Sequence, residues 1–375
     1  MRIPSLDGIR GLAALIVFGG HAGLDNVLPA GFGVTIFFFL SGFLITTLLR
    51  QEYERTGDIS LKKFYLRRIY RILPPLYIVL LLFLMPWSLR GQGAYFHPTT
   101  GAVLLQFMQL TNYYLILGDA AHLVPSTNPT WSLAIEEHFY LLFPLALLLL
   151  RRHHDYRRIG LLFALTCAAV LLWRCILVLG LHVSSDYTYY ATDARIDSLL
   201  FGCIMGVALN PVLDRCFTRL TDAQWMGALV LAAALLGFTF LYRSEVFRQT
   251  LRYSIQGVAL LPIFFCAVRH PRWWLFGWLQ SPVMRALGLI SYTFYLVHSK
   301  AIALSRAYSD SGLLRGLLAL AMTIAFASAM YYLVERHLGA LRRRLHASAL
   351  AVRPAMPAAA SGPANRPATQ TDLNR

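Results

Sequence analysis

The stretch SLDGIRGLAALIVFGGHAGL, residues 5–24, decides the fold of this chain. It is long enough to cross a membrane, because a span needs about 20 mostly apolar residues. It also carries three ionisable side chains, Asp7, Arg10 and His21. Asp7 precedes the apolar run and further apolar runs follow it, which argues against a cleaved secretory signal. We therefore interpret residues 5–24 as a retained first membrane helix.

The composition extends this interpretation to the whole chain. Of its 375 residues, 57% are hydrophobic and only 14% are charged, with a mean hydropathy of +0.55. A soluble domain has about a quarter charged residues. The formal net charge is +16, but the arginines gather in short segments between apolar runs, as membrane topology requires and nucleic-acid binding does not. The five cysteines show no metal-site spacing, and we expect no metal site. The fold class is thus an all-α polytopic membrane protein.

Ten segments are apolar and long enough to be spans: 9–24, 31–50, 72–90, 133–150, 158–182, 194–210, 225–242, 251–268, 286–307 and 312–335. Residues 100–117 form a further apolar run, which Gln106, Gln109 and Asn112 interrupt. Counting this run as a span would place the later basic loops outside. We therefore predict a re-entrant or interfacial segment at 100–117.

The basic segments set the predicted orientation. With ten spans, residues 50–71, 151–158, 214–219, 269–272 and 336–344 all fall on the side of the N-terminus, and basic loops favour the cytoplasm. Both termini are then cytoplasmic. We expect one membrane domain over residues 1–345. The Ala- and Pro-rich residues 346–375 have no helical pattern, so we expect a disordered cytoplasmic tail there.

Arg10 and His21 lie at different depths in the first span. They are eleven residues apart, which is about 16 Å along a helix. Arg10 is then near the cytoplasmic face, where it anchors the helix or binds a ligand, and Asp7 lies in the first turn. His21 lies deeper, either as a hydrogen-bonded core histidine or as a catalytic group, because an ionisable side chain in lipid usually faces a partner or a cavity.

Other polar side chains share these two levels. Glu136 and Glu137 lie near the outer end of the fourth span and His298 midway along the ninth. Adjacent acids on a helix point in different directions, so we expect at most one of them to share a cavity with His21.

Arg68 and Arg71, at i and i+3, share one helical face that suits a phosphate-rich ligand or serves as a plain topology signal. Pro74 and Pro75 follow, where we expect a bend or a new helix. We interpret Asp193, Arg195 and Asp197 as an internal salt-bridge cluster.

Five motifs together resemble the acyltransferase 3 family of integral-membrane acyltransferases. They are LDGIRGLAALIVFGGH (6–21), GFGVTIFFFLSGFLI (31–45), FYLRRIYRILPPLY (64–77), TWSLAIEEHFYLLFPL (130–145) and LGLISYTFYLVHSKAI (287–302). Each motif alone is weak, and their order makes the resemblance specific. It covers about residues 3–340. One departure is Lys300, where the family often has a proline or an apolar residue.

The resemblance implies a function and a site. The family moves an acyl group, usually acetyl from acetyl-CoA, to a hydroxyl of a carbohydrate or glycosylated acceptor, as in surface polysaccharide modification at the bacterial inner membrane. Acyl-CoA would be the donor substrate, with no bound cofactor, and glycan-assembly proteins are candidate partners. The implied catalytic residues are His21, Arg10 and Glu136. The implied substrate-binding residues are Arg68, Arg71, Glu137, His298, Asp7 and Ser41. Gly42 beside Ser41 would allow close helix approach.

The mechanism we expect uses His21 as general base on the acceptor hydroxyl, because a neutral imidazole can accept a proton at pH 7. Glu136 would orient that histidine or the acceptor. Arg10 would bind donor phosphates or stabilise developing negative charge. A two-step route through an acyl-histidine remains open. Two rival functions also remain: a proton-coupled transporter or flippase, although the motif-bearing spans show no internal repeat, and a catalytically silent binding protein.

Overall fold

The computed structural model describes residues 3–25, 27, 29–90, 97–214 and 220–341, and every regular element in these ranges is a helix. Eight helical stretches there are long and apolar enough to cross a membrane. They are Ala30–Thr56, Leu61–Met85, Asn128–Arg152, Tyr156–Gly180, Asp222–Leu241, Leu251–Arg269, Pro282–Ser305 and Gly312–Leu341. The residues of the predicted tail, 346–375, lie outside the described ranges.

The long helices are α2 (Ala30–Thr56), α3 (Leu61–Arg90), α6 (Trp131–His153), α7 (Tyr156–Cys175), α11 (Asp222–Leu241), α13 (Leu251–Arg269), α15 (Pro282–Ser305) and α16 (Gly312–Met330). Two further predicted spans are shorter helices. The first is α1 (Pro4–Gly19), which continues as the π-helical turn η1 (Gly20–Leu24), and the other is α10 (Asp197–Ala208). All ten predicted segments are therefore helical, and the predicted all-α membrane fold is confirmed.

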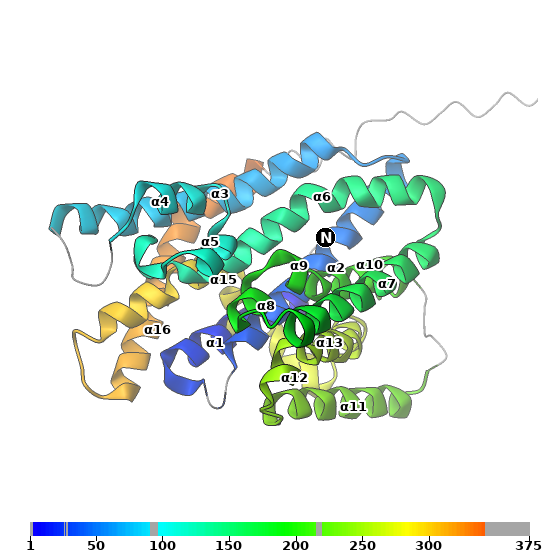
Figure 1. Cartoon of the computed structure of the whole chain (residues 1–375). Helices are drawn as coiled ribbons and strands as arrows, with labels where there is room; N and C mark the ends of the chain where they lie inside the picture. The colour runs from blue at the N-terminus through cyan, green and yellow to red at the C-terminus, as the bar shows by residue number, and fades with distance from the viewer. Residues whose placement is uncertain (1–2, 26, 28, 91–96, 215–219, 342–375) are drawn as a thin grey trace, which may run out of the picture.

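Short elements connect these helices. They are η2 (Ala120–His122), η3 (Asn128–Thr130), η4 (Ile176–Gly180), α8 (Ser185–Tyr190), α9 (Thr192–Arg195), α12 (Glu245–Gln249), α14 (Trp274–Gly277), η5 (Trp278–Gln280) and η6 (Tyr331–Glu335). In the bundle, α3 with the short α4 and α5 lies on one side and α11 on the other (Figure 1).

Residues 100–117 form no continuous span, as predicted. They divide into α4 (Thr100–Phe107) and α5 (Thr111–Leu117), and the turn between them holds Gln109 at φ 60°. A helix of eight residues is only about 12 Å long, well short of a membrane core. The buried Gln106 amide joins this segment to the stretch of chain that precedes α6. It donates to Thr127 Oγ1 over 2.8 Å and accepts from the backbone N–H of Val124 over 2.9 Å.

The α3 helix begins earlier than predicted. We expected a bend or a new helix at Pro74 and Pro75, and no new helix begins there, because one helix runs from Leu61 through both prolines. Prolines at 74 and 75 remove the amide donors for the carbonyls of Tyr70 and Arg71, and one side-chain contact joins the adjoining turn to α15. The hydroxyl of Tyr292 on α15 donates to the carbonyl of Ile72 over 2.8 Å. The continuous helix holds Arg68 and Arg71 rigidly on one face.

Small residues let two pairs of helices approach closely. A Cβ atom on Gly42 of α2 would lie 2.0 Å from the carbonyl oxygen of Leu199 on α10, which confirms the close approach expected at this position. Likewise, a Cβ on Gly288 of α15 would lie 1.9 Å from the carbonyl oxygen of Asp7 on α1. Near the other ends of α1 and α15, His21 meets His298. The two helices therefore run parallel and side by side.

The predicted cluster of Asp193, Arg195 and Asp197 is wrong in its pairing. Asp197 forms a fully buried ion pair with Arg174 of α7, with 2.7 Å between Oδ2 and Nη2. Asp193 accepts from the indole N–H of Trp173. Arg195 lies 3.8 Å from the ring centre of Tyr253. The short separation of residues 195 and 197 in the sequence suggested a local pair. The packing of the helices instead places Arg174 within ion-pair distance of Asp197.

Candidate active site

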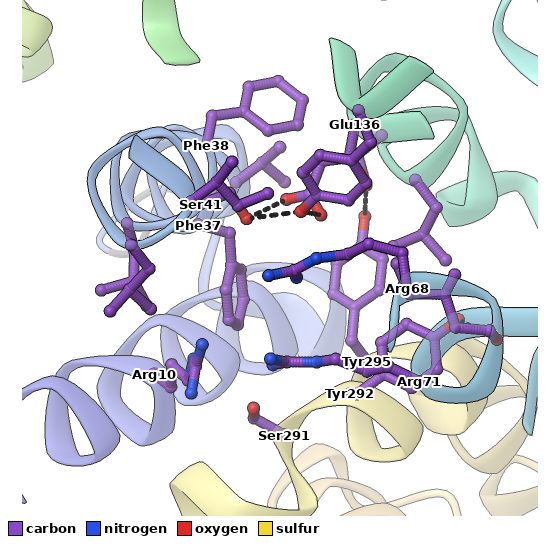
Figure 2. Close-up of a pocket in the computed structure, with 18 of the residues that line it drawn as sticks. Arg10, Phe37, Phe38, Ser41, Arg68, Arg71, Glu136, Ser291, Tyr292 and Tyr295 are labelled. Carbon is purple, nitrogen blue, oxygen red and sulfur yellow. Dashed lines mark hydrogen bonds between the residues drawn. The ribbon is translucent and has the colours of Figure 1, made fainter. Parts of the chain in front are cut away.

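Three arginines gather around one cavity of about 210 Å³ inside the bundle, which we call the arginine cavity. Arg10 comes from α1, and Arg68 and Arg71 come from α3. Figure 2 shows their guanidinium groups pointing into the same space. The remaining polar lining is Ser41, Ser132, Glu136, Tyr140, Ser291, Tyr292 and Tyr295. Three guanidinium groups against one lining carboxylate favour an anionic ligand.

The carboxylate of Glu136 is fixed by two hydroxyl groups. Ser41 donates to its Oε1 over 3.0 Å, and Tyr140 donates to its Oε2 over 2.8 Å. The guanidinium of Arg68 lies 5.1 Å from the centre of the Tyr140 ring. Asp7 lies beside Arg10, with 3.6 Å between Oδ1 and Nη1. Glu136 and Asp7 therefore offset part of the arginine charge without neutralising it.

Glu137 points away from Glu136, as expected for neighbours on a helix. It does not line the arginine cavity, and its Oε1 is buried without a hydrogen-bond partner among the described residues. Of the two acids, only Glu136 belongs to the cavity.

His21 and His298 form a second group, further along α1 and α15. His21 Nδ1 lies 3.0 Å from His298 Nε2, and the rings are stacked with centres 5.0 Å apart. His298 Nδ1 lies 2.5 Å from the carbonyl oxygen of Tyr295, which can only accept. The proton of a neutral His298 is therefore on Nδ1, and its Nε2 accepts from His21 Nδ1–H. Ser299 Oγ lies 3.2 Å from the same Nε2.

This hydrogen-bond order leaves the Nε2 lone pair of His21 available. His298 is fully buried, whereas the side chain of His21 is exposed. His21 lines a cavity of about 170 Å³ together with Ser305, Arg306, Gly312 and Arg315, which we call the histidine cavity. A neutral imidazole with a held tautomer and an accessible nitrogen is suited to accept a proton.

One aromatic ring, that of Tyr295, lies between the arginine cavity and the histidine pair. Phe37 and Tyr295 both line the arginine cavity, with ring centres 6.0 Å apart. On its other side, the Tyr295 ring lies 5.5 Å from that of His298. The Tyr295 hydroxyl is held by Ser132 Oγ at 2.7 Å and donates to the carbonyl of Pro129 over 2.9 Å. Tyr295 is thus the wall between the arginines and the histidine pair.

The structure brings most of the predicted site residues together, but in two groups rather than one. Arg10, Ser41, Arg68, Arg71 and Glu136 share the arginine cavity. His21 lies in the other cavity, and the side chain that holds it is His298, not Glu136.

Sequence reasoning missed the aromatic residues of this site: Phe37, Tyr140, Tyr292 and Tyr295. Two of them could have been found from their helical spacing in the sequence. Tyr140 follows Glu136 by one helical turn, and Tyr295 precedes His298 by three residues, so each shares a helix face with a polar residue that we had singled out.

A protein-family model with the description "acyltransferase domain" matches residues 3–332 of the chain. The chain belongs to this acyltransferase family. It is similar to the peptidoglycan O-acetyltransferase OatA of Listeria monocytogenes, at 28% identity over 353 residues, which is 89% of this chain and 55% of the relative. It is also similar to a putative O-acetyltransferase of Staphylococcus aureus strain COL, at 29% identity with 89% and 56% covered. A putative peptidoglycan O-acetyltransferase of Bacillus subtilis, YrhL, matches at 27% identity with 89% and 54% covered.

The chain spans about half the length of these curated relatives. No solved structure matches it.

Proposed function

We propose that this protein is a membrane O-acyltransferase. It moves an acyl group, most simply acetyl, from cytoplasmic acyl-CoA to a hydroxyl of a carbohydrate acceptor in or outside the bacterial plasma membrane. The observation that carries this proposal is the His21–His298 pair. It supplies an oriented base on one side of Tyr295, and three arginines supply an anion site on the other side.

The chemistry starts at the acceptor. His21 Nε2 takes the proton of the acceptor hydroxyl as its oxygen attacks the thioester carbonyl. The new C–O bond forms, the C–S bond breaks, and the proton goes on to the leaving thiolate of CoA. His298 acts as a positioning residue, because it holds the His21 proton on Nδ1 and leaves Nε2 free. The alternative two-step route would place the acyl group on the same nitrogen, Nε2 of His21.

The donor occupies the arginine cavity. Its phosphates bind Arg10, Arg68 and Arg71, whose charges Glu136 and Asp7 offset only in part. The reactive end must then extend towards His21, about 16 Å along α1 from Arg10. A long flexible arm suits this distance. The Tyr295 ring has to move for the thioester to pass, since it lies between the arginine cavity and His298.

A transporter remains the rival function, because buried histidine, arginine and glutamate also occur in proton-coupled transport. A single assay separates the two. Purified protein in membrane discs is supplied with radiolabelled acetyl-CoA and a candidate glycan. Label covalently attached to the glycan supports the acyltransferase, whereas glycan movement across vesicles without acetylation supports transport.

The decisive variant is His21→Ala. General-base catalysis contributes about 10²–10⁴-fold, so we expect transfer to fall by at least 100-fold, with unchanged thermal stability because the side chain is exposed. His298→Gln should lower kcat by about tenfold or more while the Michaelis constant for acetyl-CoA stays the same, because this change disturbs only the His21 tautomer. Wild-type turnover by a folded His21→Ala protein contradicts the proposal.

A further inference from the structure

A larger cavity, of about 440 Å³, lies at the same end of the bundle as His21. It is bordered by the start of α2, by α8, by the end of α11, by α12 and by the start of α13. The labels of α8, α12 and α13 mark this region in Figure 1. None of the site residues predicted from the sequence lines it. We call it the polar cavity.

The lining of the polar cavity combines aromatic rings with charges of both signs. Three tyrosines contribute rings, and three arginines stand with three acidic residues, namely Tyr189, Tyr242, Tyr253, Arg243, Arg248, Arg252, Asp25, Asp186 and Glu245. The formal charges of this lining therefore cancel. In the arginine cavity, by contrast, three arginines line the wall with one carboxylate. The polar cavity is thus poorly suited to a phosphate and well suited to a neutral, highly polar ligand.

We infer that the polar cavity binds a neutral saccharide unit of the acceptor. This inference rests on the proposed function and names the substrate class that this function takes. Each sugar hydroxyl both donates and accepts, so it matches carboxylates and guanidinium groups placed together. The apolar face of a sugar ring packs on tyrosine rings, which offer a flat surface with a polar end. A volume of about 440 Å³ is within the usual range of small-molecule sites, roughly 300–1,000 Å³.

The floor of this site is rigid. Tyr253 is 3% exposed, and its hydroxyl accepts from Arg252 Nη2 over 2.9 Å. The guanidinium of Arg195, fully buried, lies 3.8 Å from the Tyr253 ring centre, and its Nε has no hydrogen-bond partner in the described chain. A buried guanidinium with an unused donor is costly. Arg195 therefore has a structural use at this place, which is to hold the Tyr253 ring of the binding surface in position.

The polar cavity and the catalytic base share one chain segment. Asp25 lines the polar cavity, and His21, four residues earlier in η1, lines the histidine cavity. An acceptor unit held in the polar cavity therefore keeps the adjoining part of an oligosaccharide near His21. This arrangement selects acceptors of more than one sugar unit.

A binding measurement without any donor tests the inference. Full-length protein in membrane discs is titrated by calorimetry with three neutral oligosaccharides (chitotetraose, cellotetraose and maltotetraose) and with anionic trigalacturonate. We expect at least one neutral oligosaccharide to bind more tightly than trigalacturonate. Tyr242→Ala and Asp186→Ala, both at exposed side chains, should each raise its Kd by roughly tenfold. Tyr332→Ala, at a tyrosine that is also exposed but lies outside the cavity, should leave it unchanged.

The outcomes separate this inference from the proposed function. His21→Ala should bind the oligosaccharide like the wild type although it transfers nothing. The inference is overturned if none of the neutral oligosaccharides binds, if trigalacturonate binds more tightly, or if the cavity variants bind like Tyr332→Ala. Saccharide binding by a wild-type protein that transfers no acetyl group would instead remove the proposed function alone.

Discussion

Arginines from one basic segment, residues 50–71, have two different roles in the structure. Arg50 donates to the carbonyl of Val207 at the end of α10, over 2.9 Å, and pairs with Asp214. Arg67 pairs with Glu52 over 3.1 Å. Arg68 lines the arginine cavity and forms no ion pair with the described residues. Arg50 and Arg67 each pair with a carboxylate of the protein and are therefore structural, whereas Arg68 has its charge available for a ligand.

Replacement of Arg68 by alanine should therefore weaken donor binding. A charge-assisted hydrogen bond contributes about 1.5–3 kcal/mol, so we expect the Michaelis constant for acetyl-CoA to rise by about tenfold or more with a smaller change in kcat. Lys62→Ala is the matched control, because Lys62 is an exposed cation on the same helix outside the cavity. Initial rates at varied acetyl-CoA measure both. An unchanged Michaelis constant in Arg68→Ala would show that this arginine does not bind the donor.

At the scale of helices, the sequence predicted where elements lie better than where they begin. Hydrophobic runs located ten helical segments, eight of which are long and apolar enough to cover the membrane core. The span predicted from residue 72 starts about three helical turns too late, because α3 begins at Leu61 and its first residues are basic rather than apolar. The close approach at Gly42 was predicted from its motif, since small residues mark tight helix contacts in membranes.

A methyl group added at the α2–α10 contact should destabilise the protein. A Cβ on Gly202 would lie 2.0 Å from the carbonyl oxygen of Phe39, and backbone cannot move aside as a flexible side chain can. We expect Gly202→Ala to lower stability by about 1–3 kcal/mol, the usual range for overpacking. Gly227→Ala on α11 is the control, because no atom lies within 4 Å of its added Cβ. Thermal unfolding in detergent compares the two, and equal melting temperatures would refute the steric account.

At the scale of the whole molecule, the sequence predicted how deep each chemical group lies in the membrane. It did not predict which side of its helix faces which neighbour. Spacing along a helix gives a level in the membrane, and it placed Arg10 and His21 at different levels, as observed. It does not say which neighbour each side chain faces. His21 and His298 are 277 residues apart in sequence and meet only because α1 and α15 pack in parallel. For this reason the sequence left open whether Glu136 orients His21 or the acceptor, and it did not reveal His298 as the partner of His21.

The proposed positions of donor and base at opposite ends of the bundle predict how the protein is oriented in the membrane. The donor site requires the end with the basic segment 50–71 to face the cytoplasm, where acyl-CoA is made, and positive loops favour that side.

Single introduced cysteines can report this orientation, in a background with Cys175 and Cys216 replaced by serine. Lys62→Cys lies at the basic end. Asp310→Cys lies in the turn between α15 and α16, near His21, where the aspartate side chain is fully exposed. A membrane-impermeant maleimide added to intact spheroplasts should label Asp310→Cys at once and Lys62→Cys only after permeabilisation. The reverse pattern would place the arginine cavity outside the cell, away from its donor, and would require the acyl group to come from another source.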